Sequence, residues 1–113
     1  MDENDTYVIE FLPAALHDIS EIVSSFVMLG SVKGAKRIKD KFNKAANRLS
    51  VYPYSGVTVP DGKLAGAGYR MVVVEKYLMF YRIFESDSKV IFYRVLNGAR
   101  NYPHLFKGLE TNE

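Results

Sequence analysis

Five consecutive positions near the C-terminus bring together side chains that could act on a phosphodiester bond. Arg100, Tyr102 and His104 lie in the segment Arg100-Asn101-Tyr102-Pro103-His104. An imidazole and a phenol can serve as general base and general acid, and a guanidinium can stabilise the charge that develops during RNA cleavage. The same side chains could instead stack on a nucleotide and pair with it without any chemistry. A histidine beside a proline is also often a plain exposed residue.

Three further arginines, Arg70, Arg82 and Arg94, lie in three runs with the alternating pattern of β-strands. If the strand registers align them, they form a cluster that could hold phosphates or carboxylates bidentately. Arg82 would then join the catalytic residues if the protein cleaves RNA. The alternative is that each arginine lies at a margin of the sheet and pairs with a nearby glutamate or aspartate.

Charge is distributed unevenly along the chain. Residues 1–30 contain six acids and no lysine or arginine, and residues 33–48 contain seven bases and one acid, while the whole chain has a net charge of +2. Such polarity can orient a domain on an acidic partner, either nucleic acid or protein. A surface helix that is merely solvated by its charges explains it equally well. The candidate target-binding residues are Lys33, Arg37, Lys44, Lys63, Arg70 and Arg94.

Length and composition exclude several classes of protein. A chain of 113 residues with 48% hydrophobic and 25% charged residues is expected to form one globular domain over residues 1–113. It contains no cysteine and two histidines, so we expect no disulfide, no metal site and no cofactor. No apolar run is long enough to cross a membrane, and acids stand where a secretory signal would carry bases. We therefore expect a cytoplasmic protein.

Two helices are predicted in the first half of the chain, after a strand over residues 7–11. Pro13 suits a first helical turn, Gly30 suits a helix end, and Ser31 can cap the next helix. Apolar residues recur every three or four positions in both segments. They are Leu16, Ile19, Val23, Phe26 and Val27 in the first, and Ala35, Ile38, Phe42, Ala45 and Leu49 in the second. The short link predicts an antiparallel helical hairpin.

The second half of the chain is predicted to be mainly β. Residues 51–68 are rich in glycine and proline and indicate an irregular connection. Residues 69–74, 77–84 and 89–96 are rich in Val, Ile, Tyr and Phe, and their short links require an antiparallel meander. The tail from residue 99 to 109 is compatible with a short helix. The resulting α+β order is β-α-α-β-β-β, with the helices on one face of the sheet and the other face available to a partner.

Two blocks of this sequence resemble the RelE/ParE superfamily of bacterial toxins. The first is the strand and helix that begin Tyr7-Val8-Ile9-Glu10-Phe11-Leu12-Pro13. The second comprises Gly68-Tyr69-Arg70, residues 77–83, and residues 90–102 with their closing Arg100. The resemblance covers about residues 7–106. It implies the toxin of a type II toxin–antitoxin pair, silenced by a cognate antitoxin in a hetero-oligomer.

The resemblance implies one of two activities, because members of the superfamily divide into two branches. RelE-like toxins cut mRNA on the ribosome without a metal, and ParE-like toxins inhibit DNA gyrase. Arg70 and Arg100 match two basic positions of the RNA-cutting branch, but Leu78 stands where that branch has an arginine and Phe106 where it has a tyrosine. A leucine cannot stabilise a phosphate and a phenylalanine has no proton to give. The resemblance therefore favours gyrase inhibition, with an endoribonuclease as the alternative and an inactive interaction module as a third possibility.

Overall fold

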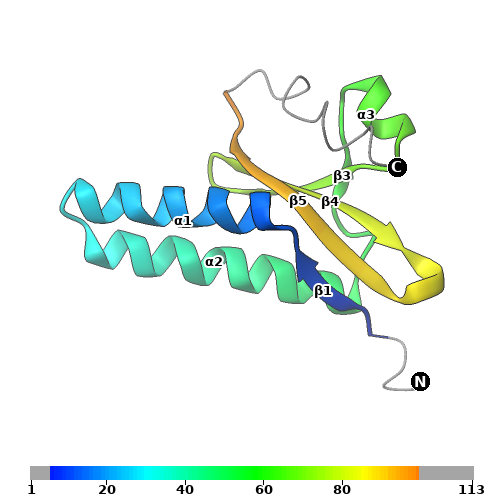
Figure 1. Ribbon diagram of the computed structural model, residues 1–113, viewed down its shortest axis with the longest axis horizontal. Coiled ribbons are helices and arrows are strands. Elements are labelled where there is room, and N and C mark those ends of the chain that lie inside the picture. Colours follow the sequence, from blue (N-terminus) through cyan, green and yellow to red (C-terminus); the bar gives the residue numbers. More distant parts are fainter. Residues whose placement is uncertain (1–5, 100–113) are drawn as a thin grey trace.

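A five-stranded sheet carries two long helices side by side on one of its faces (Figure 1). The computed structural model describes residues 6–99. In chain order the elements are β1 (Val8–Phe11), α1 (Pro13–Met28), α2 (Val32–Val51), β2 (Val57–Thr58), α3 (Gly62–Gly66), β3 (Arg70–Val74), β4 (Tyr77–Phe84), the 3-10 turn η2 (Glu85–Asp87) and β5 (Lys89–Asn97). The predicted α+β architecture is confirmed. No helix in residues 6–99 is long and apolar enough to cross a membrane.

The strand order in the sheet is β1-β5-β4-β3-β2. Strands β3, β4 and β5 form the predicted antiparallel meander, with Val74 opposite Tyr77 at the first turn. Strand β1 pairs with β5 in parallel, so the sheet is mixed rather than wholly antiparallel. The first and last strands of the described chain are thus neighbours, and the helical hairpin crosses over between β1 and the meander.

The turn between α1 and α2 is held by backbone and side-chain caps. Gly30 has a φ of +87°, a left-handed conformation that residues with a side chain rarely adopt, and it ends α1. The Ser31 amide donates to the Phe26 carbonyl (2.8 Å), and the Ser31 hydroxyl accepts a hydrogen bond from the Gly34 amide (2.9 Å). These contacts confirm both predicted helix boundaries and fix the antiparallel hairpin.

The predicted apolar face of α1 was partly wrong. Leu16 is 54% exposed and Val27 48% exposed, whereas Ala15 and Asp18 are buried. Ile19, Val23 and Phe26 do pack against the core, as predicted. Val27 lies at the far end of the hairpin, which extends beyond the sheet (Figure 1). Side chains at that end therefore have no sheet beneath them.

The main core lies between the helical hairpin and the sheet. Ile38, Phe42 and Leu49 of α2 are fully buried against Met79 and Tyr81 of β4, with Val90 and Phe92 of β5 beside them. Phe42 meets Tyr77 edge-on, with ring centroids 5.7 Å apart. These contacts explain why the helical periodicity of α2 correctly predicted which of its residues are buried.

The second face of the sheet is not open, in contrast to the prediction. The segment predicted as an irregular connection contains two short elements. Strand β2 pairs with β3, and α3 follows it, with its N-terminus capped by Asp61. Val59 and Leu64 of this segment are buried in a second, smaller core on this face. The other buried members are Tyr69, Phe80, Tyr93 and Leu96. Apolar residues in that segment make folding onto the sheet more favourable than an exposed loop.

Candidate functional site

Arg94 of β5 forms a buried ion pair with Asp18 of α1. The Arg94 Nε donates to Asp18 Oδ2 (2.7 Å), and a second guanidinium N–H donates to Oδ1 (2.9 Å). The same carboxylate accepts a hydrogen bond from the Val95 backbone amide (2.9 Å). The hydrogen bond and charge of Asp18 raise the pKa of Arg94. Both side chains are largely buried, so Arg94 links helix to sheet rather than facing solvent.

A β-bulge in β5 brings Val95, the neighbour of Arg94, onto the face of the sheet that the helices cover. The pairing of β4 with β5 shifts between Phe80 and Tyr81, and Tyr93 is the extra residue on β5. Simple alternation along β5 places Val95 on the side opposite Phe92. Instead both lie in the core under the helices, because a bulge inserts one residue and resets the alternation. The sequence carried no signal for this shift.

Arg70, at the start of β3, is held by the loop that follows α2. Its guanidinium donates to the carbonyl oxygens of Tyr54 (3.0 Å) and Gly56 (2.8 Å) and lies 5.4 Å from the centroid of the Tyr54 ring. Tyr81 holds the same loop from the core, since its hydroxyl donates to the Pro53 carbonyl (2.8 Å) and accepts from the Gly56 amide (3.2 Å). Arg70 thus has a structural role at the sheet edge.

Tyr54 extends this arrangement toward the β4–β5 turn. Its hydroxyl donates to the Glu85 carboxylate, and this hydrogen bond, with a smaller contribution from burial, raises the pKa of Tyr54 above 10.0. Arg70, Tyr54 and Glu85 therefore form a chain of contacts. The guanidinium and the phenol within it are already engaged by the protein itself.

Arg82 of β4 lies on the opposite face of the sheet from Arg70. Arg70 stands directly across from Tyr81, so these two share a face, and the next residue, Arg82, points the other way. Its guanidinium is stacked near the rings of Tyr69 (5.6 Å) and Phe84 (5.1 Å). The strand registers therefore do not bring Arg70, Arg82 and Arg94 together, and the cluster considered in the sequence analysis does not form.

The basic residues of α2 are partly neutralised within the fold. Arg37 and Lys41 both bind Glu75 in the β3–β4 turn, with Lys41 Nζ 2.9 Å from the carboxylate. The hydrogen bond from Lys41, and the charges of Arg37 and Lys41, lower the pKa of Glu75. Lys44 pairs with Asp40 at 3.1 Å on the exposed side of the helix. A basic stripe in the sequence is therefore a weaker basic surface in three dimensions.

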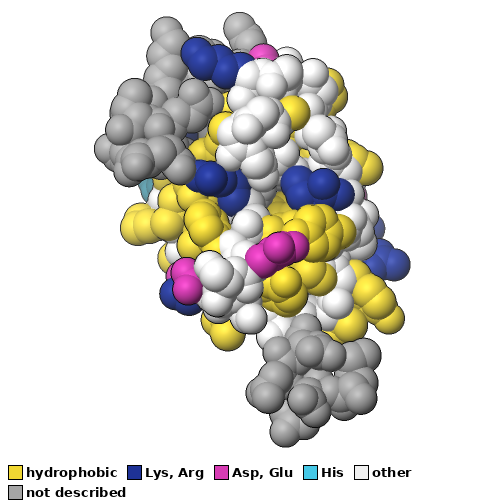
Figure 2. Space-filling model, turned by 90° about the vertical axis from the view of Figure 1, so that its right-hand side faces the viewer, with side chains coloured by type: hydrophobic (Ala, Val, Ile, Leu, Met, Phe, Trp, Pro, Cys, Tyr) yellow, Lys and Arg dark blue, Asp and Glu magenta, His cyan; other side chains and the backbone are white. Residues whose placement is uncertain are grey.

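The remaining candidate residues are dispersed. Lys33 is exposed at the start of α2 and Lys63 is exposed in α3, on different parts of the fold. Figure 2 shows Lys and Arg side chains scattered among hydrophobic ones on the face it presents, rather than gathered in one patch. Arg100, Tyr102 and His104 lie outside the described residues. Within residues 6–99 no group of His, Cys, Asp or Glu could hold a metal ion.

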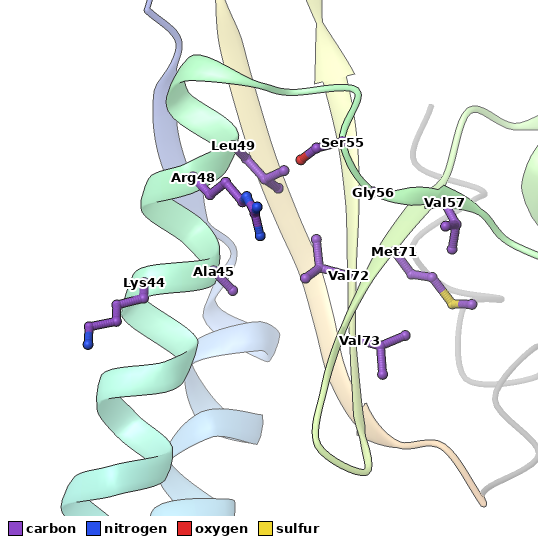
Figure 3. A pocket seen from close by; sticks show the side chains of 10 residues that line it. All are labelled: Lys44, Ala45, Arg48, Leu49, Ser55, Gly56, Val57, Met71, Val72 and Val73. Carbon is purple, nitrogen blue, oxygen red and sulfur yellow. The ribbon is translucent and has the colours of Figure 1, made fainter.

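A groove of about 540 Å³ runs between the C-terminal half of α2 and the edge of the sheet (Figure 3). Figure 3 shows the Arg48 side chain reaching from α2 toward the strands, while Lys44 points away from them at the rim. The lining residues are Lys44, Ala45, Arg48, Leu49, Ser55, Gly56, Val57, Met71, Val72 and Val73. The groove is thus mainly apolar with a basic wall.

Most of the chain matches a single protein-family model. The family model described as the ParE toxin of the type II toxin-antitoxin system, parDE, matches residues 9–102. The chain belongs to this ParE toxin family. It is accordingly the toxin component of a type II toxin–antitoxin module, as the resemblance implied. A search of curated protein sequences found no match.

Two solved structures share the fold of this ParE-family chain. One is the chromosomal ParDE toxin–antitoxin system from P. aeruginosa, with a TM-score of 0.66 and 15% identity over 82% of this chain and 97% of that one. The other is the RelBE2 toxin–antitoxin complex from Mycobacterium tuberculosis, with a TM-score of 0.56 and 19% identity over 81% of this chain and 98% of that one. At this level of identity they establish the fold alone.

Sequence reasoning missed the residues that organise this site. The sequence analysis assigned no role to Asp18 or to Tyr81. An acid on the apolar face of a helix, three residues after a buried alanine, is the one signal that could have indicated a buried ion pair. The groove had no such signal, because its walls come from segments far apart in the sequence.

Proposed function

We propose that this ParE-family toxin arrests growth by binding DNA gyrase in the cytoplasm and inhibiting it, without cleaving a substrate. A cognate antitoxin, forming a hetero-oligomer with the toxin, neutralises it. The family match to ParE supports the choice of target, and the two structural neighbours, both toxin–antitoxin systems, support the partner.

The divergence of the three strand arginines carries the proposal. Phosphodiester cleavage without a metal needs several cationic and acid–base groups converging on one phosphate. Here Arg70 and Arg82 lie on opposite faces of the sheet, and the guanidinium of Arg94 is already paired with the carboxylate of Asp18. Leu78, at the position where the RNA-cutting branch has an arginine, packs at the margin of the second core. This arrangement favours a toxin that acts by contact.

One observation favours the alternative, a ribosome-dependent endoribonuclease. Arg82 is half-buried and stacked against Tyr69, Phe84 and Tyr93, which holds its guanidinium in a fixed orientation. A fixed guanidinium on this face could contact a phosphate, provided that Arg100, Tyr102 and His104 supply the proton transfers.

Labelled precursors separate the two activities in living cells. The toxin is induced alone in bacteria, and incorporation of labelled thymidine and labelled amino acid is followed in the same culture over the first minutes. Gyrase inhibition predicts an early fall in thymidine incorporation with induction of the DNA-damage response. An immediate fall in amino-acid incorporation with DNA synthesis spared would support mRNA cleavage and contradict the proposal.

A further inference from the structure

The far end of the helical hairpin exposes a cluster of large apolar side chains. Met28 is 84% exposed and Leu29 87% exposed where α1 ends, and Val27 and Val32 are exposed beside them. These four residues are called the hairpin tip. The tip extends beyond the sheet, and none of its residues belongs to either core (Figure 1). Single exposed apolar residues are ordinary, but a group of them at one projecting end is typical of an interaction site.

The hairpin tip is held in a fixed shape by the residues beneath it. The amide of Ser31 donates to the carbonyl of Phe26 (2.8 Å) and closes the turn. The guanidinium of Arg37 lies over the Phe26 ring, 5.8 Å from its centroid. Gly34 lets α2 approach this ring closely, since a Cβ at Gly34 would lie 2.9 Å from it. An ordered surface loses little conformational entropy when it binds, so burial of its apolar side chains favours a complex.

The hairpin tip is flanked by bases. Residues 22–38 contain three bases and no acid. Arg37 is paired with Glu75 of the β3–β4 turn. Lys33 and Lys36 are exposed and form no ion pair within residues 6–99. A partner with an apolar pocket and acids around its rim would therefore match both the side chains and the charge of the tip.

Charge argues against a second copy of this chain as the partner. Two tips placed face to face would bring Lys33 and Lys36 of both copies together, and like charges oppose such a contact. Nucleic acid would match the lysines alone. Met28 and Leu29 are the most exposed large apolar side chains within residues 6–99, and they need an apolar surface opposite them. A protein partner is favoured for this reason.

We propose that the hairpin tip is the surface through which the toxin docks on DNA gyrase. Met28 and Leu29 enter an apolar pocket of gyrase, and Lys33 and Lys36 contact carboxylates at the rim of that pocket. The identity of the partner rests on the proposed function. The choice of surface rests on the exposure, the order and the charge of the tip.

A matched pair of apolar variants tests the docking surface with the full chain. The double substitution Met28→Gln with Leu29→Gln should raise the toxin concentration for half-inhibition of gyrase supercoiling by about tenfold or more. Leu16→Gln is the control, because Leu16 is also exposed on α1 but lies about 18 Å along the helix from Met28. It should leave inhibition unchanged. An unchanged thermal midpoint shows that each variant is folded.

A second pair of variants tests the charge. Lys33→Glu places an acid where the proposal needs a base, and should raise the half-inhibitory concentration about fivefold. Lys39→Glu makes the same change of charge about 9 Å further along α2, at another exposed position, and should have less than about a twofold effect. Binding of each protein to immobilised gyrase is measured beside inhibition.

Two results would overturn the docking assignment alone. They are full inhibition by the tip variants at wild-type concentrations, and equal weakening by Leu16→Gln. Binding of the toxin to plasmid without gyrase, lost in the tip variants, would assign the tip to DNA instead. Wild-type toxin that neither binds nor inhibits gyrase would contradict the proposed function, and the docking assignment with it. Failure of the assignment is therefore distinguishable from failure of the proposed function.

Discussion

The carboxylate of Asp18 binds the guanidinium of Arg94 through two hydrogen bonds, of 2.7 and 2.9 Å, and joins α1 to the bulged strand β5. A third bond, from the Val95 amide, completes the coordination of the carboxylate. This contact sets the position of the hairpin on the sheet. It also removes Arg94 from the surface that a target could reach.

Asp18→Asn should lower the free energy of unfolding by about 3 kcal/mol, because it leaves a buried guanidinium without its counter-charge. Urea denaturation of both proteins measures the difference. Asp40→Asn, which breaks the exposed pair with Lys44, is the control and should cost less than about 0.5 kcal/mol. Equal effects of the two substitutions would show that the Asp18 pair is not structural.

Tyr81→Phe should destabilise the protein by about 1–2 kcal/mol, because the Pro53 carbonyl and the Gly56 amide both lose their partner. Thermal denaturation is the measurement, with Tyr52→Phe as an exposed control. Gly56→Ala should be harmful for a related reason. A Cβ at this position would lie 2.6 Å from the Met71 carbonyl oxygen and against the Tyr81 ring.

The Glu75 contacts predict a pH dependence of stability. Binding to Lys41 and Arg37 lowers the pKa of Glu75 below its ordinary value of 4.5, so the contribution is present above that pH and is lost as the pH falls through the lowered pKa. Wild type should therefore be more stable than Glu75→Gln at neutral pH, and the two should converge in acid. A difference in unfolding free energy that stays constant from neutral to acid pH would refute this.

The strands illustrate how much of the fold was predictable. Residues 69–74, 77–84 and 89–96 were predicted from alternation and composition, and the observed strands end within one residue of those limits. Such agreement is expected where β-branched and aromatic residues alternate between two short turns. The caps at Gly30 and Ser31 were equally predictable, since they depend on neighbouring residues alone.

The arginines illustrate what the sequence did not contain. Whether Arg70, Arg82 and Arg94 meet depends on strand register and on the bulge at Tyr93, and both are set by packing of the whole sheet. The two short elements β2 and α3 were not predicted, because the glycines and prolines of this segment indicated an irregular loop. Its two apolar residues Val59 and Leu64 nevertheless pack onto the second face of the sheet. Long-range packing, rather than local propensity, decided these features.

Replacing Arg100 and His104 together with alanine should leave growth arrest in place if the toxin acts by binding gyrase through other surfaces. Growth after induction and primer extension on abundant mRNAs are the two readouts. Retained binding of the antitoxin confirms that the variant is folded. Loss of arrest together with loss of mRNA cleavage would instead assign these residues to catalysis.

The most direct test of the gyrase proposal uses purified components. The toxin is titrated into a supercoiling reaction of purified DNA gyrase and relaxed plasmid, with and without an excess of the cognate antitoxin. The proposal predicts that supercoiling falls as the toxin increases and that antitoxin restores it. Full supercoiling at a large excess of toxin, with cleavage of mRNA on purified ribosomes by the same preparation, would contradict it.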